Sequence, residues 1–244
     1  MNKNPCYALA FSMAALISPL HAEPVFPEVR KTMEGFIAAK ELAGSVTLVA
    51  DGAKILHLSA DGMANIADKR PMAEDSVFWI ASMTKPVTAT ALMMMHEEGL
   101  LSVDDPVAKY LPEFRNLQDA NGKDVTITIK QCLVHSSGLA EVTPEEARSI
   151  STLEQLMTVV AAKPVQFEPG TKWQYCQSSI NTAARLVEVV SGKPFTTFLD
   201  ERLFGPLGMK DTTFYPSEEQ AKRLASSYKR TDAGELEEAE LFFL

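Results

Sequence analysis

The chain has 244 residues, of which 46% are hydrophobic and 23% are charged, and its formal net charge is −9. These values are typical of a folded globular protein and exclude an intrinsically disordered chain. The negative charge also argues against nucleic acid or an anionic membrane surface as the main partner.

The first 22 residues have the three-part layout of a secretory signal. Lys3 supplies the positive start, an apolar stretch runs from Ala8 to Ile17, and small residues lead to Leu20-His21-Ala22. We expect cleavage after Ala22, export to the periplasm or the medium, and a single domain over residues 23–244. No apolar stretch in the sequence is long enough to cross a bilayer, so no stable membrane span is predicted.

Strand patterns come first in the remaining chain. Ser45–Ala50 and Lys54–Ser59 are joined by Asp51-Gly52, which is a strong hairpin signal. Ser76–Ile80 is predicted to be a third extended segment, leading directly into Ala81-Ser82. Met83–Glu98 then reads as a helix that is apolar nearly all round and ends at Gly99, so we expect it to be central.

The middle of the chain is predicted to be helical. Residues with capping-box spacing are the pairs Thr128 and Gln131, Thr143 and Glu146, and Ser151 and Glu154. Ser178 or Ser179 is expected to cap a further helix that runs to about Val190. Strands followed by many helices, without regular alternation, indicate an α+β fold in which an antiparallel sheet is flanked by a large helical region.

The strand patterns predict little more than one hairpin, and an isolated hairpin is marginal in water. We therefore expect the sheet to be incomplete. The chain finishes with Leu241-Phe242-Phe243-Leu244, an apolar strand-like ending. Either another chain completes the sheet, or the sequence is a C-terminally truncated form of a longer domain. An open sheet edge also predicts association or aggregation.

Ser82-Met83-Thr84-Lys85 places a hydroxyl and an amine three residues apart at the start of the central helix. Positions i and i+3 share one helix face, so the amine can reach the serine oxygen and take its proton. The helix N-terminus adds positive potential where an oxyanion would form. Pattern and context leave two roles open for Ser82, a nucleophile and a simple N-cap.

The same Ser-x-x-Lys pattern recurs at Ser226-Ser227-Tyr228-Lys229, so the bare pattern is weak. Only Ser82 follows an extended segment and opens a long apolar helix that could hold the pair rigidly. We therefore favour Ser82 and Lys85 as the reactive pair.

The wider sequence resembles the serine β-lactamase family, which includes class C β-lactamases, serine esterases and penicillin-binding-protein-like hydrolases. The resemblance covers roughly residues 27 to 235 in consistent order. The segments that carry it are Phe78–Pro86, Glu98–Val107, Tyr110–Phe114, Thr128–Lys130, Leu133–Leu139, Phe167–Gly170 and Leu203–Met209. It implies that Ser82 is the nucleophile of an SxxK motif.

The resemblance also identifies a second motif, Tyr-x-Asn, at Tyr175, Cys176 and Gln177. It implies that Tyr175 shuttles the proton between the serine and the leaving group. Gln177 departs from the family pattern by one methylene, which puts its substrate-side hydrogen bond in doubt. A packed aromatic is the alternative role for Tyr175.

The third motif of the family, Lys or His followed by any residue and Gly, does not follow Tyr175 in this sequence. In relatives that strand closes the sheet and supplies an oxyanion donor, and losing one such donor costs about 3–4 kcal/mol of barrier. The resemblance therefore implies impaired folding and catalysis for the chain as written.

No cofactor or metal is predicted, because His57, His96 and His135 have no ligand-like spacing. His135 is expected to be a loop histidine bonded to backbone. Cys132 and Cys176 could pair after export, but we favour two free, mostly buried thiols.

Three function classes follow. The favoured one is a serine hydrolase that forms an acyl-enzyme on Ser82 with a small lactam, ester or D-amino-acid peptide substrate. The second is a slow-deacylating penicillin-binding or sensor-like module, and the third is a catalytically impaired remnant.

Overall fold

The computed structural model describes residues 26–52 and 54–239. The predicted signal at 1–22 and the apolar ending at 241–244 lie outside these residues. The chain divides into two compact units. One unit combines the residues up to Ser76 with those from Leu224 onward, and the other runs from Val77 to Arg223.

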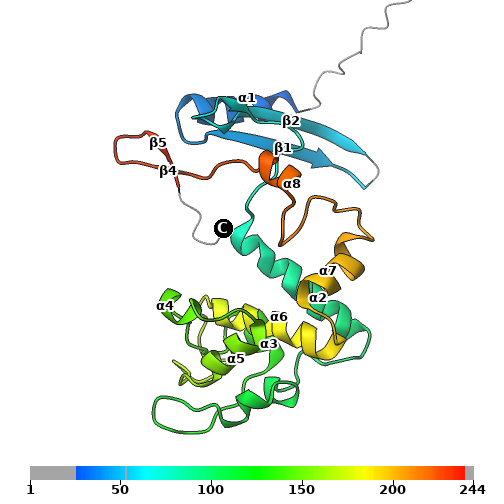
Figure 1. Cartoon of the computed structure of the whole chain (residues 1–244), viewed down its shortest axis with the longest axis vertical. Helices are drawn as coiled ribbons and strands as arrows, with labels where there is room; N and C mark the ends of the chain where they lie inside the picture. Colours follow the sequence, from blue (N-terminus) through cyan, green and yellow to red (C-terminus); the bar gives the residue numbers. More distant parts are fainter. Residues whose placement is uncertain (1–25, 53, 240–244) are drawn as a thin grey trace, which may run out of the picture. The chain divides into compact units, whose positions relative to one another are not determined.

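The first unit is a small antiparallel sheet with one covering helix (Figure 1). Its elements are α1 (Pro27–Ala38), β1 (Gly44–Ala50), β2 (Ile55–Asn65), β3 (Arg70–Pro71), β4 (Tyr228–Arg230) and β5 (Leu236–Glu238). The sheet order is β1-β2-β3, while β4 and β5 form a separate hairpin. The predicted hairpin is confirmed, and Thr47 faces Ser59 across it.

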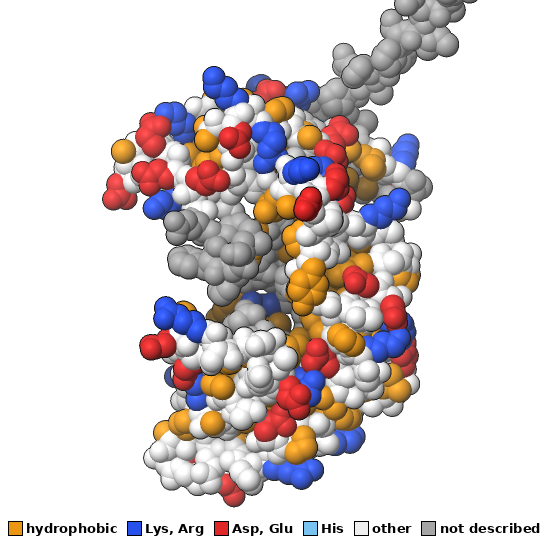
Figure 2. Space-filling view, in the orientation of Figure 1, with side chains coloured by type: hydrophobic (Ala, Val, Ile, Leu, Met, Phe, Trp, Pro, Cys, Tyr) orange, Lys and Arg blue, Asp and Glu red, His pale blue; other side chains and the backbone are white. Residues whose placement is uncertain are grey.

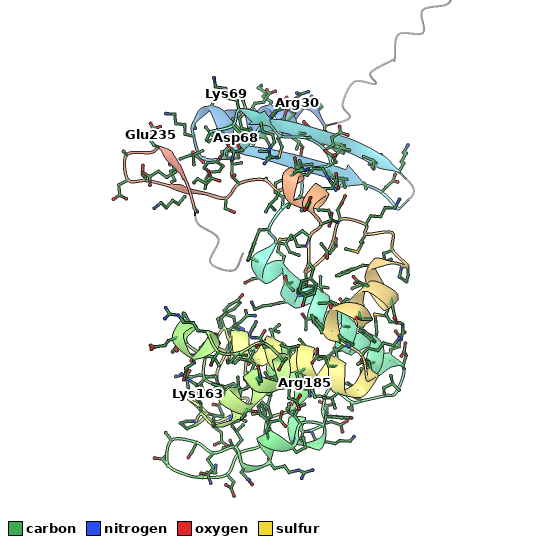
Figure 3. All side chains as sticks on the ribbon, in the orientation of Figure 1. Arg30, Asp68, Lys69, Lys163, Arg185 and Glu235 are labelled. Atoms are coloured by element: carbon green, nitrogen blue, oxygen red, sulfur yellow. The ribbon has the colours of Figure 1, made fainter. Side chains whose placement is uncertain are left out.

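Contacts from both ends of the chain hold the first unit together. Arg30 on α1 pairs with the buried Asp61 at 2.9 Å, and Lys40 pairs with Glu235 at 2.6 Å (Figure 3). The Ser226 N–H also donates to the Ala64 carbonyl at 2.8 Å. The segment after Leu224 is therefore part of the same fold as the first strands.

The second unit is helical (Figure 1). Its longer helices are α2 (Thr84–Glu97), α5 (Leu153–Ala161) and α6 (Gln177–Ser191). The shorter ones are η1 (Ala81–Met83), η2 (Val107–Lys109), η3 (Pro112–Asn116), α3 (Ile129–Leu133), α4 (Pro144–Ala147), α7 (Phe195–Leu199), the π-helix η4 (Asp200–Phe204) and α8 (Glu218–Arg223). Together with the antiparallel sheet, these elements confirm the α+β fold class.

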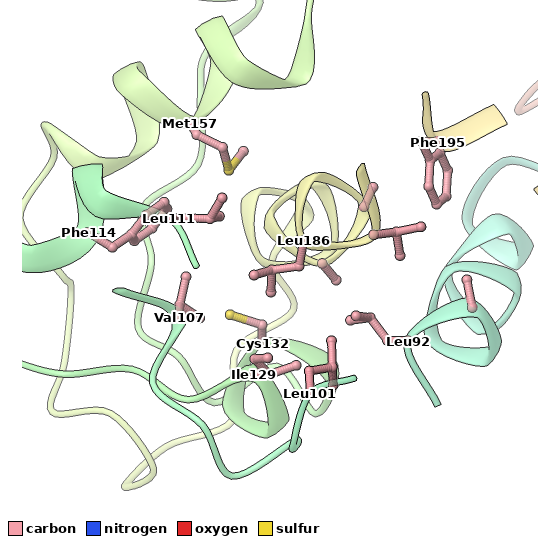
Figure 4. Packing of buried hydrophobic residues seen from close by; sticks show 14 of the residues in the cluster. Leu92, Leu101, Val107, Leu111, Phe114, Ile129, Cys132, Met157, Leu186 and Phe195 are labelled. Atoms are coloured by element: carbon pink, nitrogen blue, oxygen red, sulfur yellow. The ribbon is translucent and has the colours of Figure 1, made fainter. Parts of the chain in front are cut away.

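Helix α6 runs through the core of the second unit (Figure 4). Leu186 on α6 is fully buried, and the cluster around it includes Leu92 from α2, Ile129 from α3 and Met157 from α5. Burying a side chain of this size stabilises the fold by about 1.5–3 kcal/mol. This core fixes α2 against α6, the two helices that carry the candidate site.

Several local predictions are confirmed and others are wrong. The capping boxes at Thr128 and Thr143 are present. The cap of α5 is Thr152, one residue after the predicted Ser151. In Ser76–Ile80, predicted to be extended, Val77 forms a β-bridge through its N–H to the Arg223 carbonyl, whereas Ile80 is already helical, with φ −90° and ψ −8°.

The α2 helix is less enclosed than its sequence indicates. Met95 is fully buried, but the side chain of Met93 is 45% exposed. One of the three successive methionines therefore faces outward rather than into the core.

The face drawn in Figure 2 carries acidic side chains interspersed with basic ones. In the helical unit, Arg185 pairs with Glu188 at 2.9 Å and Lys163 pairs with Glu146 at 2.7 Å (Figure 3). Within residues 26–52 and 54–239, no helix is both long and apolar enough to cross a bilayer.

Candidate active site

Ser82 lies in the short turn η1, immediately before α2, and its side chain is exposed. The preceding residue, Ala81, has a φ of 43°, in the left-handed region that residues with a Cβ rarely adopt. Such a conformation costs about 1–2 kcal/mol and is typical of functional sites. The strained turn presents the hydroxyl at the positive end of α2.

Lys85 is one turn further along and buried, with 9% of its surface exposed. Its Nζ donates to Ser82 Oγ at 3.1 Å. The helix therefore brings the predicted hydroxyl and amine into contact, as the i and i+3 spacing requires.

Tyr175 reaches the same hydroxyl from the segment before α6. Its phenol donates to Ser82 Oγ at 2.6 Å, and Lys85 Nζ lies 4.6 Å from the centre of its ring. The three residues predicted as catalytic thus meet at one oxygen, although they come from two segments about ninety residues apart.

The pKa of the Tyr175 phenol is lowered from its ordinary value, chiefly by its interaction with the Lys85 amine and then by the Ser82 hydroxyl. An adjacent cation favours the phenolate. A phenol with a depressed pKa can exchange protons with Ser82 more readily near neutral pH.

Gln177 contacts the site despite its extra methylene. Its Oε1 accepts from Lys85 Nζ at 2.6 Å, and its Nε2 donates to Asn181 Oδ1 at 3.3 Å. Both ends of the amide are therefore engaged by the protein, and Asn181 sets which end faces Lys85.

The predicted serine cap of α6 is wrong, because the N-cap residue is Cys176. Ser178 and Ser179 lie within the helix and are buried, and the Ser179 hydroxyl lies 2.7 Å from that of Ser137. The Ser179 hydroxyl therefore links the start of α6 to Ser137, while the Ser178 hydroxyl donates to Glu141 at 3.2 Å.

Both cysteines in the described part of the chain are free and buried, as predicted. The Cys176 thiol donates to the Leu139 carbonyl at 3.3 Å, and burial raises its pKa. Burial also raises the pKa of Cys132. Neither thiol is primed as a nucleophile, since the thiolate is the reactive form.

Sequence reasoning missed Glu141 and the place of His135 beside Tyr175, although both residues hold this site together. The Nδ1 atom of His135 accepts from the Cys176 N–H at 3.1 Å, so the histidine is bonded to backbone as expected, but beside Tyr175. The carboxylate of Glu141 accepts from the N–H groups of Gln177 and Ser178. In residues 26–52 and 54–239, no group of His, Cys, Asp and Glu side chains has the arrangement of a metal site.

Comparison with known proteins identifies the family. Residues 29–242 match the family model described as Beta-lactamase. The chain therefore belongs to the Beta-lactamase family, as its sequence resemblance predicts.

Among the curated relatives, the chain is similar to Esterase EstB of Burkholderia gladioli, with 32% identity over 223 residues that cover 86% of this chain and 55% of the esterase. It is also similar to the D-alanyl-D-alanine-carboxypeptidase/endopeptidase AmpH of Escherichia coli K12. That match has 28% identity and covers 92% of this chain and 60% of AmpH. The chain thus spans between half and two thirds of the length of these two relatives.

Solved structures show the same fold. EstCE1, described as a hydrolase with promiscuous acyltransferase activity, superimposes with a TM-score of 0.78 at 28% identity, covering 87% of this chain and 58% of EstCE1. The β-lactamase/D-alanine carboxypeptidase of Yersinia pestis has a TM-score of 0.69 at 24% identity, covering 81% of this chain and 57% of that protein. The second likeness concerns the fold alone.

Proposed function

We propose that the protein is a serine hydrolase that forms an acyl-enzyme on Ser82 with small ester or amide substrates, lactams included. The observation that carries the proposal is the convergence of Lys85 Nζ, at 3.1 Å, and Tyr175 Oη, at 2.6 Å, on Ser82 Oγ. An exposed hydroxyl that contacts a buried amine and a phenol of lowered pKa has the parts of an activated nucleophile.

In the acylation step, Ser82 Oγ attacks the substrate carbonyl carbon while its proton passes to the Tyr175 phenolate. Lys85 keeps its positive charge beside both oxygens and stabilises the negative charge that moves between them. The tetrahedral intermediate collapses as the bond to the leaving group breaks, and Tyr175 returns the proton to the leaving alcohol or amine.

In the deacylation step, water attacks the Ser82 ester and gives its proton to Tyr175. The carbon–oxygen bond to Ser82 then breaks, and the proton returns to the serine oxygen. The free carboxylic acid leaves, and the site is restored with no cofactor consumed.

The descriptions of two relatives support an acyl substrate. One is described as an esterase and the other as a D-alanyl-D-alanine carboxypeptidase. Both chemistries transfer an acyl group, so a small acyl compound is the substrate class that we propose for this chain.

The test is covalent labelling of the purified chain with a fluorophosphonate and with a penicillin, read by intact mass. We expect one adduct per chain in the wild type and in Ser226→Ala, and none in Ser82→Ala. A fluorophosphonate adduct in Ser82→Ala, or a folded wild type that no acyl probe labels, would refute the proposal.

The lifetime of the penicillin adduct separates two of the function classes. Release within the time of the assay indicates a hydrolase, whereas a persistent adduct indicates a slow-deacylating penicillin-binding module. The third class, an impaired remnant, is a chain that is folded but not labelled. A circular dichroism spectrum shows whether an unlabelled chain is folded.

We also propose that the protein is exported and that residues 1–22 are removed. The proposal rests on the sequence from Lys3 to Ala22. Mass spectrometry of the protein from a periplasmic fraction should give a chain that begins at Glu23. Retention of the full chain in the cytoplasm would contradict it.

A further inference from the structure

The turn that opens α6 has an unusual set of hydrogen bonds. Successive backbone N–H groups, those of Cys176, Gln177 and Ser178, all donate to side chains of a single distant loop. The Cys176 N–H donates to His135 Nδ1 at 3.1 Å. The other two donate to the carboxylate oxygens of Glu141, at 2.5 Å and 3.0 Å.

These contacts replace a local cap. The first N–H groups of a helix have no partner within it, and a side chain at the N-cap position usually accepts from one of them. The N-cap residue of α6 is Cys176, whose side chain makes no cap hydrogen bond, and its thiol donates to the Leu139 carbonyl instead. The acceptors for α6 therefore come from the 135–141 loop, and Glu141 places a negative charge at the positive end of the helix.

His135 is itself held in a defined state. Its φ is 60°, and its carbonyl accepts from the Gln174 N–H at 2.9 Å. Because Nδ1 accepts from Cys176, the proton of the neutral ring lies on Nε2. Burial, and then the charge of Lys85, lower the pKa of His135, which favours this neutral form.

The segment that these hydrogen bonds fix, residues 175–178, carries two residues of the candidate site. The His135 ring lies 4.7 Å from the Tyr175 ring at an angle of 30°, with Trp173 edge-on to the histidine at 6.1 Å. Tyr175 immediately precedes Cys176, whose N–H donates to His135, and the N–H of Gln177 itself donates to Glu141. The loop thus sets the two side chains that contact Ser82 and Lys85.

We propose that His135 and Glu141 are positioning residues for the acyl-transfer reaction. They clamp the backbone of residues 176–178, so that the Tyr175 phenol stays on Ser82 Oγ and the Gln177 amide stays on Lys85 Nζ. The effect of this clamp on acylation rests on the proposed function, whereas the hydrogen bonds that form the clamp do not.

The clamp makes the reaction sensitive to acid. A proton on His135 Nδ1 removes the acceptor for the Cys176 N–H and sets a cation against Tyr175. The charged or titratable groups that act on His135 are Lys85 from α2 and Glu141 from its own loop, with Tyr175 and Cys176 packed against it. Activity should therefore fall on the acid side as His135 is protonated.

Two substitutions of His135 separate its acceptor from its bulk. Asparagine offers Oδ1 near the position of Nδ1, tolerates a positive φ and has no proton to gain. Alanine has no acceptor. We expect His135→Ala to lower the acylation rate by about ten- to a hundredfold with little change in substrate affinity, since small misplacements of reacting groups cost that much.

We expect His135→Asn to recover most of the acylation rate that His135→Ala loses. In this variant the rate should no longer fall at acid pH through protonation of residue 135. Glu141→Ala should also slow acylation, and the double variant His135→Ala with Glu141→Ala should lose less than the product of the single losses, because both side chains hold one segment. Glu145→Gln, a nearby exposed carboxylate on α4, is the control and should react like the wild type.

A second measurement needs no catalysis. The Tyr175 phenol can be followed through a pH titration by NMR with labelled tyrosine, assigned with Tyr175→Phe. In His135→Ala the pKa of Tyr175 should rise toward its ordinary value as the phenol leaves Lys85, and in His135→Asn it should stay low.

An unchanged Tyr175 titration in His135→Ala would overturn the clamp, and so would an asparagine variant as impaired as the alanine variant in both measurements. If the wild type does not react with acyl probes, the proposed function fails, and the titration still decides the clamp.

Discussion

Two copies of the same pattern, Ser-x-x-Lys, occur in this molecule and take different structures. In the first, Ser82 lies in η1 immediately before α2, Lys85 lies in the first turn of α2, and Lys85 Nζ donates to Ser82 Oγ at 3.1 Å. In the second, Ser226 precedes β4 and Lys229 lies within it. Ser226 Oγ accepts from Asn65 Nδ2 at 2.8 Å, while Lys229 pairs with Glu237 at 3.5 Å.

The comparison shows that backbone conformation decides what the spacing can do. On a helix, residues three apart are neighbours on one face. On an extended chain, they are roughly 10 Å apart and point to opposite sides. Burial separates the copies as well, because Lys85 is buried whereas the side chain of Lys229 is 67% exposed.

Lysine replacement should give the largest difference between the two copies. We expect Lys85→Met to slow the acylation of Ser82 by about a hundred- to a thousandfold, the usual cost of removing one group that stabilises the charge developing in the transition state. Lys229→Met should leave the rate unchanged, because an exposed ion pair contributes little. The measurement is the second-order rate of labelling by a penicillin, which acylates the serine, and similar losses in both variants would remove the distinction.

The next largest effect is expected at Tyr175, whose phenol donates to Ser82, whereas the group that donates to Ser226 is the Asn65 amide. Tyr175→Phe removes the phenol 2.6 Å from Ser82 Oγ and should slow acylation by about a hundredfold or more. Tyr215→Phe is the control, since Tyr215 is 78% exposed.

The lowered pKa of Tyr175 also predicts how the acylation rate changes with pH. The Lys85 amine, and then the Ser82 hydroxyl, lower the pKa of Tyr175, so the reactive phenolate forms at lower pH than in an ordinary tyrosine. The wild-type rate should rise with pH through that pKa, and the phenylalanine variant should lack this rise. A rise that persists in Tyr175→Phe would assign it to another group.

Much of the fold and site could be predicted because the relevant signals are local. The Asp51-Gly52 hairpin and the caps at Thr128 and Thr143 each involve residues close in sequence. The pairing of Ser82 with Lys85 follows from helix geometry alone. The meeting of Tyr175 with Ser82 was predicted only through the family resemblance.

The parts that were not predicted depend on distant contacts. Glu141 caps α6 from 36 residues away, so no pattern near Ser178 reveals it, and the local serines were mistaken for the cap. The left-handed φ of Ala81 has no glycine to mark it. The acceptor role of His135 depends on where the Cys176 N–H lies after folding.

A smaller catalytic effect is expected at Gln177, whose Oε1 accepts from Lys85 Nζ. Gln177→Leu removes the acceptor at 2.6 Å from Lys85 Nζ, and we expect acylation to slow by about tenfold, the usual consequence of losing one such hydrogen bond. Gln177→Asn shortens the side chain by one methylene, restores the residue of the family motif and should stay close to the wild type. If Gln177→Leu reacts as fast as the wild type, the Gln177 contact does not position Lys85.

The smallest effect is expected at Ser226, and it concerns stability instead of rate. Asn65 is buried, with 9% of its surface exposed, and its Nδ2 donates to Ser226 Oγ while its Oδ1 accepts from the Asp68 N–H at 2.7 Å. Ser226→Ala leaves the amide without this acceptor, so the free energy of unfolding should fall by about 1–2 kcal/mol. Urea unfolding measures this change, and Ser227→Ala is the neighbouring control. The variant should still label at Ser82 at the wild-type rate, because its hydroxyl stabilises the sheet unit and takes no part in acyl transfer. A lower labelling rate at unchanged stability would mean that the second Ser-x-x-Lys copy acts on the reaction after all.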